Sequence, residues 1–381
     1  MKLTSKPLGQ AIVALLAAGL LLAGCTNDAA PGASPAAPGG TTDTAAASTS
    51  DFKPVGACSA DRTPPAAGAT IETGPAITVA WVPKLLGLSV FEANNKGATQ
   101  AGADLGITVN YTASVEANGA DQAQIIDGLV NSNNPPDVIA YSANDPTTIV
   151  PSLEAATAKG ILVIGMDSDV TASARLFFIQ NTSYPAMGKS FVDAAVQKYG
   201  DSGTIGILST IPEATIQNEW IKAITDYGKA TYPNIKFTDP VYGESNAAKS
   251  QTETVNLMNQ YPDMLAVFAL DSSAVPGSLA AIKAQGKGGK IGVWGVSTPN
   301  ANKQYFQDGS LDGLWLWDEV KEGELMAYLA RGVCDNKIPQ SGDFTAGSLG
   351  TFTVTDDPAP HTIIFSEPLL IDKNNYTNYD F

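Results

Sequence analysis

The sequence predicts an α/β protein with two doubly wound parallel-sheet lobes joined by a hinge of several strands. Three observations predict this fold class. Apolar runs with strand spacing alternate with segments of helical spacing from residue 77 almost to the end. The run 161–166 is apolar throughout, as strands buried in a parallel sheet are. About 300 residues follow a low-complexity start, which is more than one core usually serves.

The segment 77–97 is the first strand–loop–helix unit. It starts with an alternating apolar run that predicts a strand, and Pro83 ends the strand because it has no backbone N–H to donate. Helical spacing starts at Phe91. Ligands of open parallel sheets bind at the carboxyl ends of the strands. Lys84 and Phe91, which lie in this loop, are therefore candidate ligand-binding residues.

The first lobe repeats this order of strand and helix. Asp167 and Asp169 directly follow its last strand, so they are expected on the ligand-facing edge of the sheet. A glycine at residue 160 ends the helix before that strand. The predicted strands are 107–111, 137–141 and 161–166, and the predicted helices are 121–131 and 149–159.

The second lobe is expected to start where residues 176–180 cross over to it. The segment 314–317 is expected to return to the hinge, and a late helix covers 319–331. The predicted strands are 204–209, 236–242, 264–270 and 291–296, with closing strands at 353–356 and 363–368; the helices are 184–199, 217–230, 247–260 and 276–285. The expected first lobe is thus residues 76–179 plus 298–318, and the expected second lobe is residues 180–297 plus 319–370.

Residues 1–24 have the features of a lipoprotein signal peptide. A positive start precedes an apolar run that is too short to span a bilayer, and small residues stand before Cys25 as in a lipobox. The alternative is an ordinary signal peptide with an incidental cysteine. Residues 25–70 are rich in small and polar residues, which predicts a disordered tether. We therefore expect an extracytoplasmic protein that is anchored to the cell membrane through a lipid on Cys25.

The charge excludes one class of function. The formal net charge is −16 and becomes −18 when residues 1–24, which hold two lysines and no acidic residue, are removed. Such a surface repels nucleic acid and anionic lipid. No helix-turn-helix pattern precedes residue 77. A transcription factor is excluded, and no nucleic-acid partner is expected.

Two cysteines remain once Cys25 carries lipid. In an exported chain Cys58 and Cys334 are expected to form a disulfide that ties the start of the folded part to the second lobe. The alternative is two buried free thiols. A metal site is not expected, because His361 is the one histidine and no second cysteine lies near either thiol. No cofactor is expected.

Several motifs carry a resemblance to a known family. Residues 82–106, which read VPKLLGLSVFEANNKGATQAGADLG, resemble the opening of the ribose-type periplasmic sugar-binding proteins. Within that family the sequence resembles the branch that holds the autoinducer-2 receptor (Lsr-type) and the rhamnose-binding protein, and the similarity runs through nearly all of residues 77–381. The other matching motifs are GMDSD at 165–169, IQNEW at 216–220, STPN at 297–300, LWDE at 316–319 and the terminal NYDF.

The resemblance implies a fold, a function and partners. The fold is that of a type I periplasmic binding protein. The function is to capture a small sugar or polyol and to deliver it to the permease of an ABC importer. The ATPase belongs to the transporter, since this chain has no GxxxxGK[ST] motif. A monomer is expected for this family.

The candidate site follows from the chemistry of a sugar, whose hydroxyls need charged or amide partners and whose C–H face packs on aromatic rings. Asp167 either binds the ligand or caps a helix, and Asp169 is either a cap or a partner that orients Lys84. Gln217 matches a ligand-binding amide of the autoinducer-2 receptor. The candidate ligand-binding residues are Lys84, Phe91, Asp167, Asp169, Gln217, Asn218, Trp220, Asp271, Ser297 and Trp317.

Three more of these candidates could have a structural role in place of a ligand-binding one. Trp220 either contacts the ligand or packs in the core, as helix aromatics commonly do. Asp271 follows a predicted strand and is either a ligand-binding residue or a helix cap. Trp315 and Trp317 share one face of a predicted strand, so one is expected to stack on the ligand and the other to lie in the core.

The site departs from the autoinducer-2 receptor at half of its positions. That pattern has a lysine, two aspartates, a glutamine, a proline and an alanine. Lys84, Asp167 and Gln217 match three of the six. Losing a charge-assisted acceptor changes ligand choice strongly, so we expect another small, hydroxyl-rich ligand. The second aspartate, the proline and the alanine align with Ile216, Leu270 and Ser272.

Three further functions remain as alternatives. One is autoinducer-2 binding and uptake, and another is a sensor that presents its ligand to a membrane signalling protein. The third is a glycoside hydrolase, with Asp167, Asp169 or Asp271 as acid and base. A binding cleft for sugars holds the same acids, and the sequence has no nucleophile motif or metal cluster. We therefore do not expect an enzyme.

Overall fold

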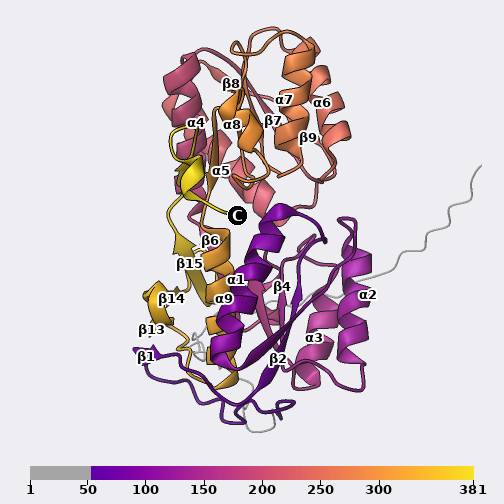
Figure 1. The fold of residues 1–381 in the computed structure, drawn as a ribbon, viewed down its shortest axis with the longest axis vertical. Coiled ribbons are helices and arrows are strands. Elements are labelled where there is room, and N and C mark those ends of the chain that lie inside the picture. Colours follow the sequence, from indigo (N-terminus) through magenta and orange to yellow (C-terminus); the bar gives the residue numbers. More distant parts are fainter. Residues whose placement is uncertain (1–52) are drawn as a thin grey trace, which may run out of the picture. The chain divides into compact units, whose positions relative to one another are not determined.

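The computed structural model describes residues 53–381, which form two α/β lobes with largely parallel sheets (Figure 1). This confirms the predicted fold class. The predicted signal peptide, Cys25 and the tether up to residue 52 lie outside the described residues.

The first lobe is built on a sheet with the strand order β1-β13-β14-β15-β6-β5-β4-β2-β3. From β3 to β15 neighbouring strands are parallel, whereas β13, β14 and β15 pair antiparallel. The strands are β1 (Ala69–Thr70), β2 (Ile77–Val82), β3 (Ile107–Tyr111), β4 (Val138–Tyr141), β5 (Leu162–Met166), β6 (Phe177–Thr182), β13 (Gly342–Thr345), β14 (Thr351–Thr355) and β15 (Thr362–Ser366).

Helices cover both faces of this sheet. Side chains of β2 point alternately to the two sides: Trp81 joins the core beneath α1 and α9, and Val82 joins the core beneath α2 and α3. Because both faces are buried, β4 and β5 consist of apolar residues and one tyrosine. The helices are α1 (Ser89–Leu105), α2 (Gly119–Val130), α3 (Val150–Ala158) and α9 (Glu319–Cys334).

The second lobe repeats the plan with the strand order β16-β12-β11-β10-β7-β8, and β9 also pairs with β7. All pairs are parallel except β12 with the edge strand β16. The strands are β7 (Gly203–Ser209), β8 (Ile235–Phe237), β9 (Val241–Tyr242), β10 (Met264–Ala269), β11 (Gly292–Gly295), β12 (Gly313–Leu316) and β16 (Leu369–Ile371). The helices are α4 (Tyr184–Tyr199), α5 (Thr215–Thr231), α6 (Ala247–Gln260), α7 (Ala274–Ala284) and α8 (Lys303–Gln307).

The chain passes between the two sheets after β6, between β12 and α9, and between β15 and β16. The expected lobe boundaries are therefore wrong near the end of the chain. Residues 313–316 form β12 of the second lobe instead of returning to the hinge, and residues 319–366 belong to the first lobe. Hydrophobic spacing predicts a strand but does not say which sheet the strand joins. The lobe to which these two segments belong could therefore not be predicted from the sequence.

Two further expectations are corrected. Residues 177–182 are a strand of the first lobe, and the first crossing follows them. The strand expected at 236–242 is split into β8 and β9 by Thr238, Asp239 and Pro240. Proline cannot donate to a ladder, and Thr238 instead accepts a hydrogen bond from the N–H of Ile207 through its hydroxyl (3.0 Å).

Residues 53–70 are folded, so the predicted tether extends too far at its end. The N–H of Val55 donates to the carbonyl of Gly160 (3.0 Å), and β1 pairs with β13. The expected disulfide joins Cys58 to Cys334. Because Cys334 ends α9, the disulfide ties this segment to the first lobe, not to the second. The segment is held by a disulfide and by backbone hydrogen bonds. Composition does not report such bonds, so the composition of the segment predicted disorder.

The helices α1 and α9 approach each other through two glycines. A Cβ at Gly97 would lie 1.8 Å from the carbonyl oxygen of Val320, and a Cβ at Gly323 would lie 1.9 Å from that of Asn94. Only glycine permits this separation. The close contact brings Asn94 of α1 against Glu319 at the start of α9.

Candidate ligand-binding site

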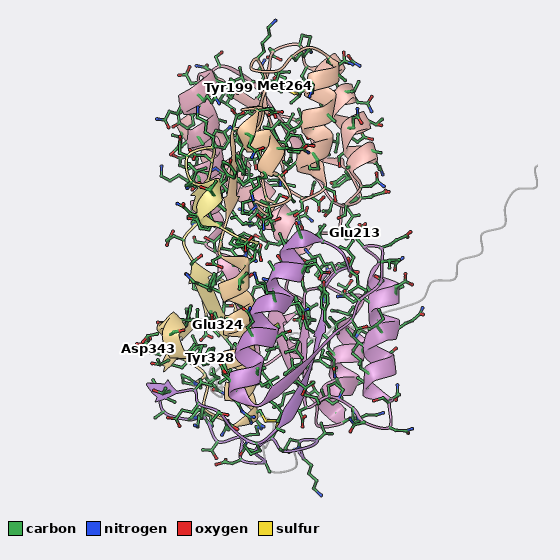
Figure 2. All side chains as sticks on the ribbon, in the orientation of Figure 1. Tyr199, Glu213, Met264, Glu324, Tyr328 and Asp343 are labelled. Carbon is green, nitrogen blue, oxygen red and sulfur yellow. A yellow bond between two sulfur atoms is a disulfide. The ribbon has the colours of Figure 1, made fainter. Side chains whose placement is uncertain are left out.

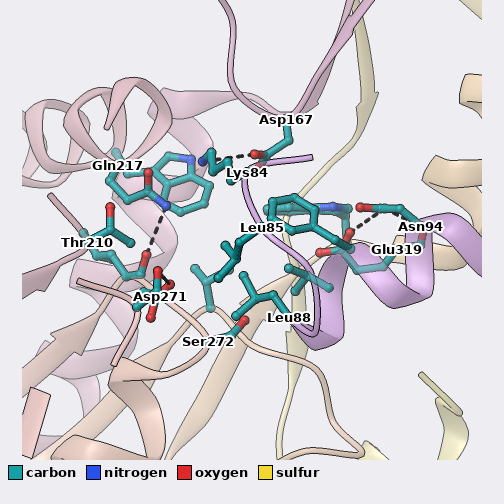
Figure 3. A pocket seen from close by; sticks show the side chains of 17 residues that line it. Lys84, Leu85, Leu88, Asn94, Asp167, Thr210, Gln217, Asp271, Ser272 and Glu319 are labelled. Atoms are coloured by element: carbon teal, nitrogen blue, oxygen red, sulfur yellow. Dashed lines mark hydrogen bonds and ion pairs between the residues drawn. The ribbon is translucent and has the colours of Figure 1, made fainter. Parts of the chain in front are cut away.

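A cavity of about 480 Å³, measured out to its open mouth, lies between the lobes (Figure 3). Its walls come from the ends of β2, β5, β7, β9, β10, β11 and β12, from α1 and α5, and from the start of α9. The lining residues are Lys84, Leu85, Leu88, Val90, Phe91, Asn94, Asp167, Thr210, Gln217, Trp220, Ser245, Leu270, Asp271, Ser272, Val296, Trp317 and Glu319.

The loop that carries Lys84 is held by buried amides. Nε2 of Gln122 donates to the carbonyls of Pro83 (3.2 Å) and Ser142 (2.7 Å), at the ends of two neighbouring strands. Nδ2 of Asn144 donates to the carbonyl of Lys84 (3.0 Å). The backbone after β2 is therefore fixed although Pro83 ends the strand, and the lysine has a defined position.

Asp167 lies opposite Lys84, as the sequence predicted for the end of β5. Its Oδ2 is 3.2 Å from Nζ of Lys84 and accepts a hydrogen bond from Oγ of Ser142 (2.6 Å). No backbone N–H among residues 53–381 is found donating to its carboxylate, so the helix-cap alternative has no support. Its φ of 68° is in the left-handed region, which non-glycine residues adopt mainly where surroundings over-determine them, often at functional sites.

Asp169 has a different role from either expectation. Its carboxylate accepts from Nε and Nη2 of Arg175, with the shorter bond at 2.6 Å, and from the hydroxyl of Tyr141 (3.1 Å). It does not line the cavity, and Lys84 pairs with Asp167 instead. Both aspartates lie beyond the end of β5, where strand alternation no longer applies, and the ion pair with Arg175 holds Asp169 away from the cavity.

The second lobe contributes Gln217 and Trp220 from α5. Both are buried and both line the cavity. Among the described residues, Oε1 of Gln217 and Nε1 of Trp220 have no hydrogen-bond partner. The Trp220 ring lies 6.0 Å from that of Trp317 at an angle of 51°. Trp220 therefore packs in the core and also faces the cavity, and the two alternatives are not exclusive.

Asp271 likewise combines both of its alternatives. Its Oδ1 accepts from the N–H of Ser273 (2.9 Å) and of Ala274 (3.2 Å) at the start of α7, as a cap does. Its Oδ2 accepts from Oγ of Ser245 (3.1 Å), and the side chain lines the cavity. Burial raises the pKa of this carboxyl above its usual range.

Besides Asp169, two predicted residues lie outside the cavity lining. Asn218 is exposed on α5, and its Nδ2 donates to the carbonyl of Pro212 (2.8 Å). Ser297 is fully buried and its hydroxyl accepts from Nδ2 of Asn302 (2.7 Å). Phe91 lines the cavity as predicted and meets Trp81 edge-on at 6.2 Å between ring centres.

Sequence reasoning missed the floor of the cavity, where Asn94, Glu319 and Glu322 meet. Nδ2 of Asn94 donates to Oε2 of Glu319 (2.8 Å) and of Glu322 (3.3 Å), and Nε1 of Trp317 donates to Oε2 of Glu322 (2.8 Å). Burial, and after it the charge of Asp167, raises the pKa of Glu322 to about 8. Burial and the neighbouring carboxylates of Glu322 and Asp167 raise the pKa of Glu319 well above its usual range. In sequence the two glutamates look like ordinary helix-surface charges, and only their position beneath α1 distinguishes them.

Within residues 53–381, no group of three or more His, Cys, Asp or Glu side chains is arranged to hold a metal ion. In the same part of the chain, every helix is too short or too polar to cross a membrane. The groups that line the cavity can bind a small molecule through hydrogen bonds, through the charges of Lys84 and Asp167, and through aromatic faces.

Comparison with known proteins identifies proteins that are similar to this chain in sequence and in structure. The D-ribose/D-allose-binding protein of Pseudomonas aeruginosa is 23% identical over 203 residues, which are 51% of this chain and 61% of that protein. The chain thus matches about three fifths of the length of this curated relative. LsrB from Clostridium saccharobutylicum, solved in complex with AI-2, is 26% identical with a TM-score of 0.75, and the match covers 80% of this chain and 100% of that one.

A second solved structure shares the fold. The ABC transporter solute-binding protein from Clostridium phytofermentas with bound L-rhamnose has a TM-score of 0.75 at 22% identity, over 80% of this chain and 98% of that one. The profile of the periplasmic binding protein domain matches residues 79–338, which is more than half of the chain. The resemblance to ribose-type binding proteins is thereby confirmed. The chain belongs to the family of the periplasmic binding protein domain, with the two-lobed fold of its type I members.

Proposed function

We propose that this protein is a lipid-anchored, extracytoplasmic solute-binding protein that captures a small sugar or polyol between its lobes and delivers it to an ABC importer. The observation that carries the proposal is the composition of the cavity. Its walls come from both lobes and combine hydrogen-bonding groups with the rings of Phe91, Trp220 and Trp317. Hydroxyl groups and a C–H face are what such walls complement.

Closure of the lobes on the ligand would supply the affinity. Lys84 and Asp167 from the first lobe and Gln217 from the second face the same cavity. A ligand that contacts both lobes at once binds the closed form better, so it shifts the population toward that form. The unpartnered Oε1 of Gln217 and Nε1 of Trp220 are an acceptor and a donor for such a ligand.

The relatives support the class of ligand. One is named for D-ribose and D-allose, and two were solved with AI-2 or L-rhamnose bound. For this chain we propose a hydroxyl-rich ligand other than AI-2. At the positions that align with three ligand-binding residues of the autoinducer-2 receptor, Ile216 is fully buried in the core, and Leu270 and Ser272 line the cavity. A carboxylate at position 216 is replaced by an apolar side chain.

We propose that the closed form binds an importer and not a signalling receptor. We also propose that the protein acts as a monomer and does not catalyse a reaction.

A lipid on Cys25 would keep the protein at the membrane. The Cys25→Ser variant is expected in the culture medium or the soluble extract, whereas the parent protein stays with membranes. Equal membrane association of the two proteins would contradict anchoring and leave the binding proposal intact.

The ligand is tested by a thermal-shift screen of the purified protein with pentoses, deoxyhexoses, pentitols and AI-2, followed by calorimetry. A ligand that binds only the folded state raises the melting temperature. We expect one neutral sugar or polyol to raise it and the Asp167→Ala variant to lose that shift. A shift with AI-2 alone would favour the receptor alternative. Conversion of any glycoside by the purified protein would contradict a pure binding function.

A further inference from the structure

Two carboxyl groups are buried beneath the cavity, one turn apart at the start of α9. Glu319 is 1% exposed and Glu322 is 0% exposed. Glu319 lines the cavity itself, and Glu322 lies behind it. Groups from four other places face the pair: Asn94 of α1, Asp167 after β5, Asn181 of β6 and Trp317.

The pair is not neutralised by a cation. In residues 53–381 neither glutamate has a Lys, Arg or His within ion-pair distance; Lys84 pairs with Asp167, and Lys321 on the same helix pairs with Asp318. Asp167 adds a further negative charge nearby. A buried carboxylate without a cation is costly, and the group keeps its proton instead. The direction of the pKa shifts described above agrees with this.

The hydrogen bonds decide which oxygen of Glu319 carries the proton. Nδ2 of Asn94 donates to Oε2 (2.8 Å), so Oε2 is the acceptor of the acid (Figure 3). The side chains of Glu319 and Glu322 also form a hydrogen bond with each other. Within the described part of the chain neither Oε1 atom has a hydrogen-bond partner, so this bond joins the two Oε2 atoms. With Glu322 as the donor of that bond, the O–H of the uncharged Glu319 is at Oε1 and is available to a molecule in the cavity.

We propose that Glu319 is a further ligand-binding residue that donates a hydrogen bond from Oε1, as an uncharged carboxylic acid, to an oxygen of the ligand. This inference rests on the proposed function and specifies the ligand further. A donor at this position favours a neutral hydroxyl, ether or carbonyl oxygen. A ligand with an ammonium group would instead require the ionised carboxylate. Asn94 is the positioning residue, since it fixes the orientation of the acid.

The test compares two substitutions of Glu319, because glutamine keeps the shape of the uncharged acid and its donor while alanine removes both. Calorimetry with D-ribose, D-allose, L-rhamnose and the pentitols at pH 7 gives the affinities. We expect Glu319→Gln to stay within about threefold of the parent and Glu319→Ala to bind about tenfold more weakly. The matched control is Glu324→Gln, which removes a carboxylate from the outer side of the same helix (Figure 2) and leaves the affinity unchanged.

If Glu319→Gln weakens ligand binding as much as Glu319→Ala does, the proposal is wrong. Such a result would mean that Glu319 binds the ligand as an ionised carboxylate that accepts a hydrogen bond. Melting curves establish that each variant is folded.

A second readout does not depend on any ligand. The infrared difference spectrum of parent minus Glu319→Gln at pH 7 is expected to contain the carbonyl band of a protonated carboxylic acid. If that band is absent, the proposal is wrong whatever the protein binds. If the band is present and none of the sugars binds, the proton on Glu319 is supported, and it is the proposed sugar or polyol function that fails.

Discussion

The two lobes present different kinds of groups to the cavity. In the first lobe the charged pair is complete, because Asp167 is held by Lys84 and Ser142, and Asn94 orients Glu319 although Oε1 of that residue has no partner within the described residues. In the second lobe Oε1 of Gln217, a lining residue, has none within residues 53–381. The first lobe also holds the disulfide and the glycine contact between α1 and α9.

This difference indicates a division of labour. A preorganised wall loses little conformational freedom when a ligand meets it, so the first lobe is suited to receive the ligand. Groups that lack partners gain hydrogen bonds only when a ligand reaches them, so the second lobe is suited to stabilise the closed form. Five predictions test or refine this comparison, starting with the largest expected effect.

Removal of the disulfide should destabilise the first lobe. The Cys58→Ala/Cys334→Ala double variant is expected to lose about 2–5 kcal/mol of unfolding free energy, because the two cysteines are 276 residues apart in sequence. Calorimetric unfolding with and without reductant measures the loss, and reductant should not affect the variant. An unchanged melting temperature would show that backbone pairing alone holds residues 53–70.

Widening the contact between α1 and α9 should have the next largest effect. In Gly323→Ala the new Cβ meets the backbone of Asn94 at 1.9 Å, so the helices must separate, at a cost of about 3 kcal/mol. Gly128→Ala in α2 is the matched control: its Cβ meets nothing within 4 Å, and the helix should gain about 0.5–1 kcal/mol. Equal denaturation midpoints for the two variants would contradict the tight contact. Ligand affinity should fall with Gly323→Ala alone, since Asn94 and Glu319 shift.

Asp167→Ala should weaken ligand binding by about 1.5–3 kcal/mol, because a charge-assisted hydrogen bond is lost and Lys84 loses its partner. Calorimetry with the ligand found in the screen measures this. Asp169→Asn, two residues on, should lower the melting temperature through Arg175 but leave affinity within about threefold. The opposite pattern would exchange the roles given to the two aspartates.

Stability should fall with rising pH because of the buried acid pair. The pKa of Glu322 is raised from 4.5 to about 8 in the folded protein, so the folded state binds more protons than the unfolded state between these values. The contribution of Glu322 to the free energy of unfolding is fully present below pH 4.5. It is lost as the pH rises to about 8, by at most about 1.4 kcal/mol per pH unit. Denaturant titrations at several pH values should show a flatter profile for Glu322→Gln. Parallel profiles of the two proteins would mean that Glu322 is ionised throughout.

The smallest effect should come from the second lobe. Gln217→Ala is expected to weaken binding by about 0.5–1.5 kcal/mol and to leave the unliganded protein as stable as before, because its one hydrogen bond to Leu270 is long (3.4 Å). Calorimetric affinity and melting curves separate the two. Asn218→Ala, its exposed neighbour on α5, should change neither. A loss of stability without a loss of affinity would remove Gln217 from the site.

The sequence predicted the repeating units well because each depends on local signals. The alternation at Ile77–Val82, the apolar run at Leu162–Met166 and the helix at Tyr184–Tyr199 all follow from spacing and nearby glycine or proline. Lys84 and Asp167 were predicted in the cavity for the same reason, since parallel strands bring their carboxyl ends to one edge.

What the sequence did not predict depends on contacts between distant segments. The sheet that β12 joins is decided by its pairing with β11, and the sheet that β13 joins is decided by its pairing with β14. Asp167 and Asp169 have the same residue type and almost the same position, and only the location of Arg175 distinguishes them. Glu319 looks like a surface charge until α1 is packed over it through Gly97.

The route of the chain also has a consequence for biogenesis. The second lobe needs residues 184–316 and, near the end of the chain, the edge strand β16 and the segment after it, where Tyr376 stacks on Phe306. The first lobe starts earlier but lacks α9 and three strands until the last fifth of the chain has been made. A chain that emerges from its N-terminus onward can therefore assemble the later half first. Cys58 must wait unpaired during that time for Cys334, so the maturation of this protein is expected to depend on the oxidative machinery outside the cytoplasm.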